Sequence, residues 1–291
     1  MTGNTVSRNA PPTIAAMDGR VTKKMLQALA PLPDTAMRLL ALLDDPKVSL
    51  RDIADVAVRD VGISATMLRM ANSPMFGLRG RIGSVSDALR VIGTAQARLL
   101  VLASGVSQIG QKELSFYGLA AGSFLRHSEL VGNLTMYVAR EVGYANIGSA
   151  YSAGLLHDIG KIVINGVAQQ SGPYGRGSIG ALMDKNACTL SEAERFLCGN
   201  THAEVGRSLA EIWSLPAELC AAITLHHEAL TPDAENRLAC CVAIANVAAC
   251  AVDPTYPEFN RVDALPTPCP VDMERVYATA EAYGAEMARS A

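Results

Sequence analysis

Apolar residues recur along most of the chain three and four residues apart, which is the spacing of an amphipathic α-helix. No segment shows the pattern of a β-sandwich or a β-barrel. We therefore predict an all-α protein made of two packed helical subdomains. The predicted helices cover residues 35–43, 61–71, 84–92, 95–106, 124–142, 150–163, 192–213, 237–252 and 271–289, and further helices begin at Ser49 and after Leu215. A stretch rich in Gly, Ser and Gln predicts a loop at 169–180.

Short polar motifs indicate where several of these helices begin. Ser49, Ser84 and Thr189 are each followed three residues later by an acidic residue, which is the arrangement of a capping box. Asp34 is expected to cap the first of the helices, because a short acidic side chain can accept a hydrogen bond from a free backbone N–H. Gly93 is expected to interrupt the long apolar stretch that follows Ser84.

The composition sets the scale of the fold. Apolar residues make up 49% of the 291 positions and aromatic residues only 5%, so Ala, Leu, Val and Met must supply most of the core. Residues 1–20 lack apolar periodicity and predict a flexible tail. We place the two helical subdomains at 21–115 and 116–291.

The charge distribution is uneven but does not point to a nucleic acid. Residues 1–120 carry 14 Lys or Arg against 9 Asp or Glu, whereas residues 121–291 carry 11 against 19. The basic residues are scattered and are not interleaved with aromatic side chains.

No apolar run approaches the ~20 residues that span a bilayer, so we predict no membrane span. Seven cysteines without a Cys-x-x-Cys motif indicate reduced thiols and a cytoplasmic location.

All five histidines lie within about one hundred residues of the second half, at His127, His157, His202, His226 and His227. Imidazole is the commonest metal ligand in proteins. Asp158 directly follows one of them inside an apolar stretch, and Gly160 lets another backbone or a ligand come close. We expect the histidines and Asp158 to converge on one pocket that binds metal. Lys161 is placed where it can meet a phosphate.

Each of these signals also has a simpler interpretation. The pair His157 and Asp158 is compatible with a buried, hydrogen-bonded structural pair. The pair His226 and His227 is compatible with a surface position at the end of a helix, where the helix dipole favours positive charge. Lys161 taken alone is more typical of a solvated helix residue. The five histidines taken together favour metal binding.

The order of these residues resembles the HD superfamily of metal-dependent phosphohydrolases, and the first half resembles the HDOD domain. The HDOD resemblance rests on Pro31-Leu32-Pro33, Asp60-Val61-Gly62-Ile63, Leu68-Arg69-Met70-Ala71-Asn72-Ser73, Ile82-Gly83-Ser84-Val85, Ala88-Leu89 and Ile92-Gly93. It covers about residues 22–252. The resemblance implies that an HD-like helical bundle follows an N-terminal helical subdomain, and that the protein is a bacterial signalling module.

The resemblance also implies a ligand set. His127, His157, Asp158 and Asn246 match the basic metal-binding set of the superfamily. His202, His226 and His227 match the additional ligands of binuclear members such as the HD-GYP phosphodiesterases. Asn246 stands where the family usually has Asp, so one ligand charge is missing. The Gly-Tyr-Pro segment of the HD-GYP signature is also absent.

Two functions follow from the resemblance. The first is an HDOD-type regulator that binds signalling proteins or a nucleotide-type ligand and retains one or two divalent ions, either Fe, Mn, Zn, Ni or Mg. The alternative is a metal-dependent phosphohydrolase or phosphodiesterase. In that enzyme Asp158 would bridge two ions that activate water, and Lys161 would offset the charge of the phosphate. Asn246 favours the regulator, and the five histidines favour the enzyme.

Overall fold

The computed structural model describes residues 32–73, 76–78, 80–171, 177–228, 231, 233, 235–253, 256 and 269–290. These residues form helices and no strand, apart from one isolated antiparallel bridge between Leu114 and Leu119. The prediction of an all-α fold is therefore confirmed. The predicted tail at 1–20 lies outside the described residues.

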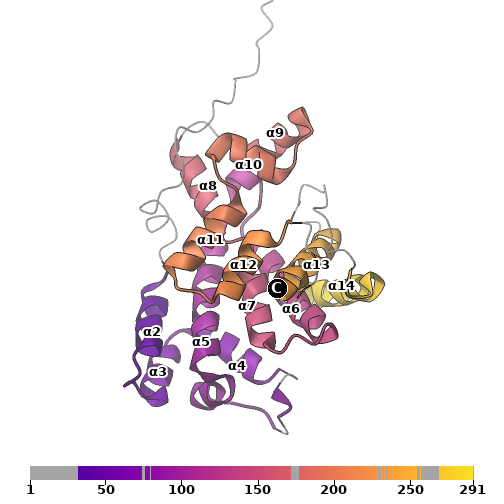
Figure 1. Cartoon of the computed structure of the whole chain (residues 1–291). Coiled ribbons are helices and arrows are strands. Elements are labelled where there is room, and N and C mark those ends of the chain that lie inside the picture. The colour runs from indigo at the N-terminus through magenta and orange to yellow at the C-terminus, as the bar shows by residue number, and fades with distance from the viewer. Residues whose placement is uncertain are drawn as a thin grey trace, which may run out of the picture.

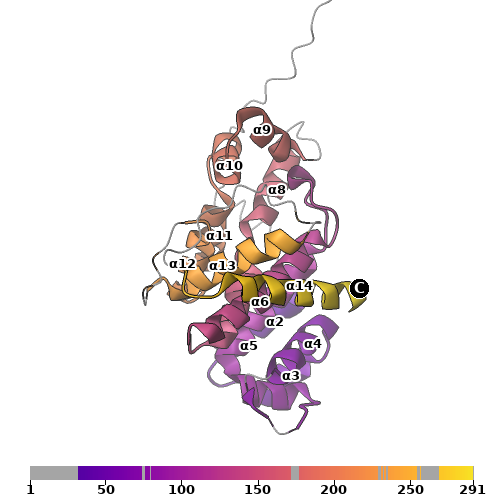
Figure 2. The same ribbon diagram turned by 90° about the vertical axis from the view of Figure 1, so that its right-hand side faces the viewer.

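The described helices are arranged in three tiers (Figures 1 and 2). The bottom tier contains α2 (Asp34–Asp44), α3 (Leu50–Ala57), α4 (Val61–Ala71) and the start of α5 (Val85–Gly110). After the 3₁₀ turn η2 (Ser115–Tyr117), the middle tier contains α6 (Ser123–Glu141), α7 (Ile147–Leu156), α11 (His202–Ile212), α12 (Ala217–Leu225), α13 (Arg237–Val252) and α14 (Met273–Ser290). The top tier contains α8 (Gly160–Ser171), α9 (Ser178–Asn186) and α10 (Leu190–Cys198).

Most of the predicted helix starts agree with the structure. Ser49 and Thr189 form complete capping boxes, and the Ser84 hydroxyl accepts a hydrogen bond from the backbone N–H three residues later. The predicted cap at Asp34 is wrong. Pro33 occupies the cap position and Asp34 is the first helical residue, so its side chain makes no cap hydrogen bond.

The longest helix, α5, contains the interruption predicted from Gly93. This glycine has φ 77° and ψ 163°, which is not helical, and the helix continues beyond it to Gly110. By length and composition α5 passes the test for a membrane span, contrary to the prediction that no stretch does. However, 61% of its most apolar window is buried inside the protein, where it packs on helices α2, α3, α4 and α7. The core therefore accounts for its apolar character.

Two predicted helices are in fact broken near the predicted ligand residues. The predicted helix 150–163 is divided by a turn at 157–159, between the end of α7 and the start of α8. The predicted helix 192–213 is divided into α10 and α11. Gly199 ends α10 in a left-handed conformation, and Thr201 starts α11 with a capping box. The predicted loop at 169–180 is shorter than expected, because α8 extends to Ser171 and α9 begins at Ser178.

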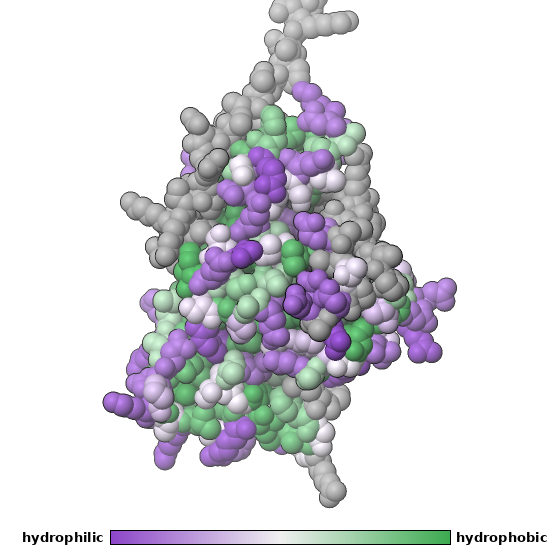
Figure 3. Space-filling model, in the orientation of Figure 1, coloured by the Kyte–Doolittle hydropathy of each residue, from purple (hydrophilic) through white to green (hydrophobic). Residues whose placement is uncertain are grey.

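A single cluster of buried apolar side chains extends from α2 to α14, so the two predicted subdomains share one core. The face seen in Figure 3 mixes hydrophilic and hydrophobic residues over all three tiers. The predicted boundary at 115–116 falls within η2, and it stays a prediction.

Candidate metal centre

Helix ends supply most of the residues that the sequence analysis selected. His157 and Asp158 lie in the turn between α7 and α8, and His202 is the first residue of α11. His226 and His227 follow directly after α12. The remaining two come from helix interiors, His127 from α6 and Asn246 from α13. Side chains at helix ends can turn inward from different directions, so the chain brings these distant segments to one place.

The histidines and Asp158 form two overlapping groups. One contains Asp158, His202, His226 and His227, and the other contains His127, His157 and Asp158. Within each group the possible ligand atoms all lie within 4.8 Å of one another. All of these side chains are buried except that of His227, which is partly exposed. Asp158 is the shared member.

The ligand atoms of the first group are closely spaced. His202 Nε2 lies 2.9 Å from His227 Nε2 and 3.3 Å from His226 Nε2. Asp158 Oδ1 lies 3.2 Å from His202 Nε2 and 3.6 Å from His226 Nε2. Two ligands bonded to one ion at about 2.1 Å are themselves about 3.0–3.4 Å apart at tetrahedral or octahedral angles. The spacing in this group is therefore that of ligands around a single ion.

In three of the histidines, the contacts of Nδ1 determine that the other ring nitrogen, Nε2, faces the centre. Nδ1 of His157 lies 2.7 Å from the carbonyl of Gly154, and Nδ1 of His226 lies 2.8 Å from the carbonyl of Ile223. Nδ1 of His202 lies 2.8 Å from a carboxylate oxygen of Glu194. Because carbonyl and carboxylate oxygens only accept, each Nδ1 carries a proton, and Nε2 is the ring nitrogen that faces the centre. Metal-binding histidines are held in the same way, with one ring nitrogen donating to an oxygen and the other facing the metal.

Several nitrogen atoms are crowded together at the buried centre. Nε2 of His202 lies 3.3 Å from Nε2 of His226 and 2.9 Å from Nε2 of His227. His157 Nε2 is buried and has no hydrogen-bond partner in the described part of the chain, although buried polar atoms are normally paired. Burial, followed by the neighbouring His227, holds the pKa of His226 well below its usual range, so this ring stays neutral. These residues fit a bound cation.

Glu194 supports His202 in this cluster and was not selected from the sequence. It is fully buried, and it accepts hydrogen bonds from the His202 backbone N–H at 2.8 Å and from the Tyr117 hydroxyl at 2.7 Å. Burial lowers the pKa of His202, but the Glu194 carboxylate and hydrogen bonds with Asp158 and Glu194 raise it to about 9. A signal was present, because Glu194 lies on the buried face of α10 between Leu190 and Leu197.

The other oxygen of Asp158 is already used. Asp158 Oδ2 accepts hydrogen bonds from Lys161 Nζ at 2.6 Å and from the Tyr256 hydroxyl at 2.5 Å. Lys161 is only 2% exposed, so its interpretation as a solvated helix residue is wrong. Burial raises the pKa of the Asp158 carboxyl, but the charges of His157 and Lys161 hold it well below its usual range. The carboxylate stays ionised at the centre.

Tyr256 was also missed, because a single tyrosine in a proline-rich segment has no pattern that marks it. Its ring stacks on the ring of His127, with centroids 3.7 Å apart and planes 4° from parallel. Its hydroxyl also accepts from Lys161 Nζ at 3.0 Å. On the other side of His127, Nε2 lies 3.0 Å from Asn246 Oδ1, so Asn246 stands beside the histidine that the resemblance pairs with it.

Comparison with known proteins identifies related sequences and folds. The family model of the HDOD domain matches residues 29–229. A Treponema pallidum protein named only as uncharacterized is 23% identical over 251 residues, which are 84% of this chain and 47% of that protein. The chain thus spans about half the length of this curated relative.

Solved structures share the fold. An HDOD domain protein of unknown function from Geobacter sulfurreducens is 25% identical, with a TM-score of 0.54, over 92% of this chain and 93% of that one. A Shewanella amazonensis structure named "Putative phosphohydrolase" is 23% identical, with a TM-score of 0.61, over 91% and 96%. A Marinobacter aquaeolei structure named "Putative signal transduction protein" is 21% identical, with a TM-score of 0.56, over 92% and 59%. The last two show the fold alone.

Proposed function

Because this chain belongs to the HDOD family, we propose that it is a regulatory signalling protein that retains one divalent metal ion in its HD-like half. The observation that carries the proposal is the convergence of His202, His226 and His227 on Asp158 Oδ1, with their ligand atoms 2.9–3.6 Å apart. The Nδ1 atoms of His202 and His226 are held outward by acceptors, which leaves both Nε2 atoms to the ion.

A single ion fits the contacts better than two. In a binuclear centre both oxygens of Asp158 would serve a metal. Here Oδ2 already accepts from Lys161 and Tyr256, and the buried ammonium places a positive charge beside the second group. That group also has neutral Asn246 where the family supplies a carboxylate. Lys161 therefore takes the electrostatic role of a second cation.

The donor set favours a first-row transition ion over magnesium. Three imidazoles and one carboxylate oxygen suit Zn, Fe, Ni or Mn, whereas Mg prefers oxygen ligands and bound water. When bound, such an ion supplies Lewis acidity and lowers the pKa of a water molecule. His202 is oriented for this role by Glu194, and the ionised Asp158 supplies the negative charge of the site.

The contacts of Lys161 favour regulation over hydrolysis. A phosphate-binding lysine must offer its ammonium to the substrate, whereas Lys161 Nζ donates to Asp158 and Tyr256 and is almost fully buried. The second candidate is a phosphohydrolase. The partial exposure of His227 supports it, because a substrate can approach the ion from that side. Its substrate would be a nucleotide or another phosphodiester.

Metal analysis beside an activity screen tests the proposal. The purified full chain is expected to hold about one equivalent of a transition metal by elemental analysis, and to hydrolyse neither p-nitrophenyl phosphate nor bis-p-nitrophenyl phosphate. A protein that binds no metal after reconstitution would refute the metal centre. Metal-dependent turnover that is lost in the double variant His157→Ala and Asp158→Ala would replace the regulator with the enzyme.

Replacing Lys161 with methionine tests the number of ions. Methionine keeps an unbranched apolar side chain but removes the ammonium from Asp158 Oδ2. The expected result is a rise from about one towards two metal equivalents per chain, measured by elemental analysis after dialysis against the metal. The matched control is Lys185→Met at an exposed position of α9, which should leave the metal content unchanged. An unchanged content in Lys161→Met would mean that the ammonium does not exclude the second ion.

Replacing Glu194 with glutamine tests how His202 is held. Glutamine has the same length but lacks the charge that faces His202 Nδ1. Loss of such a supporting carboxylate weakens metal affinity about 10- to 100-fold, which a chelator competition titration measures. Glu211→Gln on the exposed face of α11 is the control and should bind metal as the wild type does. Equal affinity in Glu194→Gln would show that His202 needs no such support.

A further inference from the structure

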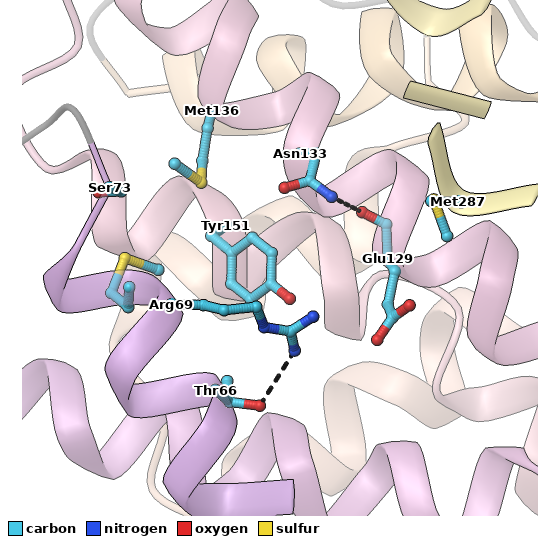
Figure 4. A pocket seen from close by; sticks show the side chains of 9 residues that line it. Thr66, Arg69, Ser73, Glu129, Asn133, Met136, Tyr151 and Met287 are labelled. Atoms are coloured by element: carbon cyan, nitrogen blue, oxygen red, sulfur yellow. Dashed lines mark hydrogen bonds between the residues drawn. The ribbon is translucent and has the colours of Figure 1, made fainter. Parts of the chain in front are cut away.

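A cavity on the other side of the fold from α8 to α10 has the features of a second ligand site. It lies where α4 meets α6, α7 and α14, and its volume is about 160 Å³ (Figure 4). It is lined by Thr66, Arg69, Met70, Ser73, Glu129, Asn133, Met136, Tyr151 and Met287. A wider groove of about 590 Å³ shares Arg69, Glu129, Asn133 and Met287 with it. The cavity is comparable in volume to engineered cavities of about 150 Å³ that hold benzene.

Polar groups without partners point into this cavity. Tyr151 is 92% buried, and among the described residues its hydroxyl makes no hydrogen bond, although Figure 4 shows it directed at the space beside Arg69. Its ring is held in place by Gly132, where a Cβ would come within 3.2 Å of the ring. Ser73 Oγ is buried and has no hydrogen-bond partner in the described part of the chain. Buried polar groups are normally satisfied, so Ser73 Oγ indicates an occupant, and the Tyr151 hydroxyl is available to bind the same occupant.

Opposite charges also face the cavity without meeting each other. The guanidinium of Arg69 makes one hydrogen bond, to Thr66 Oγ1 at 3.3 Å. The carboxyl of Glu129 makes no hydrogen bond or ion pair among the described residues, although it is partly buried. Burial raises the pKa of Glu129 above its usual value, and the charge of Arg69 offsets only part of this rise. An occupant with a positive and a negative end would satisfy both side chains at once.

The remaining wall is apolar and adaptable. Met70 from α4, Met136 from α6 and Met287 from α14 also line the cavity. Methionine side chains accommodate varied apolar shapes because they are unbranched and polarizable. The occupant should therefore combine a compact apolar body with its two charges.

We propose that this cavity binds a free α-amino acid with an apolar side chain. Its ammonium group meets Glu129, its carboxylate meets Arg69 and the Tyr151 hydroxyl, and its side chain packs against the three methionines. This function goes beyond the metal centre and does not depend on it. The amino acid is then a small-molecule signal for the regulator. It binds where the N-terminal helices meet α6 and α7.

Calorimetric titration of the full chain with L-methionine and L-leucine tests the proposal. One binding site per chain is expected, with the same affinity before and after removal of metal by a chelator. Methionine methyl ester, which lacks the carboxylate, and the deaminated acid, which lacks the ammonium, should each bind about tenfold more weakly or worse, because each loses a charge-assisted hydrogen bond.

Two pairs of variants locate the site. Glu129→Gln should weaken binding about tenfold or more, and Tyr151→Phe several-fold, by loss of their hydrogen bonds. Glu141→Gln and Tyr137→Phe, on the same helix α6 but outside the cavity lining, should bind as the wild type does. Thermal melts of all four establish that they are folded. No heat at millimolar amino acid, preferential binding of an uncharged nucleobase, or unchanged binding in Glu129→Gln would each overturn the proposal.

Discussion

Replacing Asp158 with alanine is expected to abolish metal binding and to lower the free energy of unfolding of the metal-free protein by about 3–5 kcal/mol, the usual cost of removing one partner of a buried ion pair. The reason is Lys161, whose ammonium is 2.6 Å from Asp158 Oδ2 and is almost fully buried. Without the carboxylate, the ammonium still contacts the hydroxyl of Tyr256 at 3.0 Å, but it loses the negative charge of Asp158.

Urea unfolding of the metal-free proteins measures this cost. The double variant Asp158→Ala and Lys161→Met removes both charges, so it should regain a large part of the lost stability without regaining metal. The control Asp184→Ala changes an exposed carboxylate on α9 and should stay within about 0.5 kcal/mol of the wild type. If the single and double variants are equally unstable, the destabilisation comes from lost packing and not from an uncompensated charge.

The ligand residues could be selected from the sequence because their chemistry is specific to residue type. Histidine is uncommon in this chain, and five histidines within one region stand out without any knowledge of the fold. Their partners do not stand out in this way. Glu194 is one acid among 28, and only the position of α10 beside the start of α11 reveals that it faces His202. Tyr256 is revealed in the same way, only by its stacking on His127.

The helix breaks at the site were missed for a different reason. Apolar periodicity predicts a helix wherever buried side chains recur, and Leu156, Ile159, Ile162 and Val163 are all buried across the turn. The pattern therefore runs through the turn at 157–159 without a gap. This turn also directs the side chains of His157 and Asp158 towards the same centre. The prediction of helices from apolar periodicity therefore fails at the candidate site.

Helix α8, which follows this turn, meets helix α11, which begins at His202. The two helices meet at Gly160, the first residue of α8. A Cβ at this position would lie 1.9 Å from the His202 carbonyl oxygen and 2.8 Å from the Gly206 backbone nitrogen. Both contacts are with backbone atoms, so no side chain can rotate away to make room. Gly160 was expected from the sequence to let another backbone or a ligand come close, and in the structure the backbone of α11 lies there.

Gly160→Ala is therefore expected to separate α8 from α11 and to lower the free energy of unfolding by about 3 kcal/mol, the upper part of the range for overpacking. Because α11 begins at His202, the same displacement should draw the Nε2 atom of His202 away from Asp158 Oδ1, now 3.2 Å distant, and reduce metal content.

The control is Gly284→Ala in α14, where a Cβ meets nothing within 4 Å. That change should keep the metal and raise stability by up to about 1 kcal/mol through helix propensity. Chemical unfolding and elemental analysis of both variants decide the matter: a Gly160→Ala protein as stable and as metal-rich as the control would show that α8 and α11 tolerate separation, and that their close contact does not set the geometry of the centre.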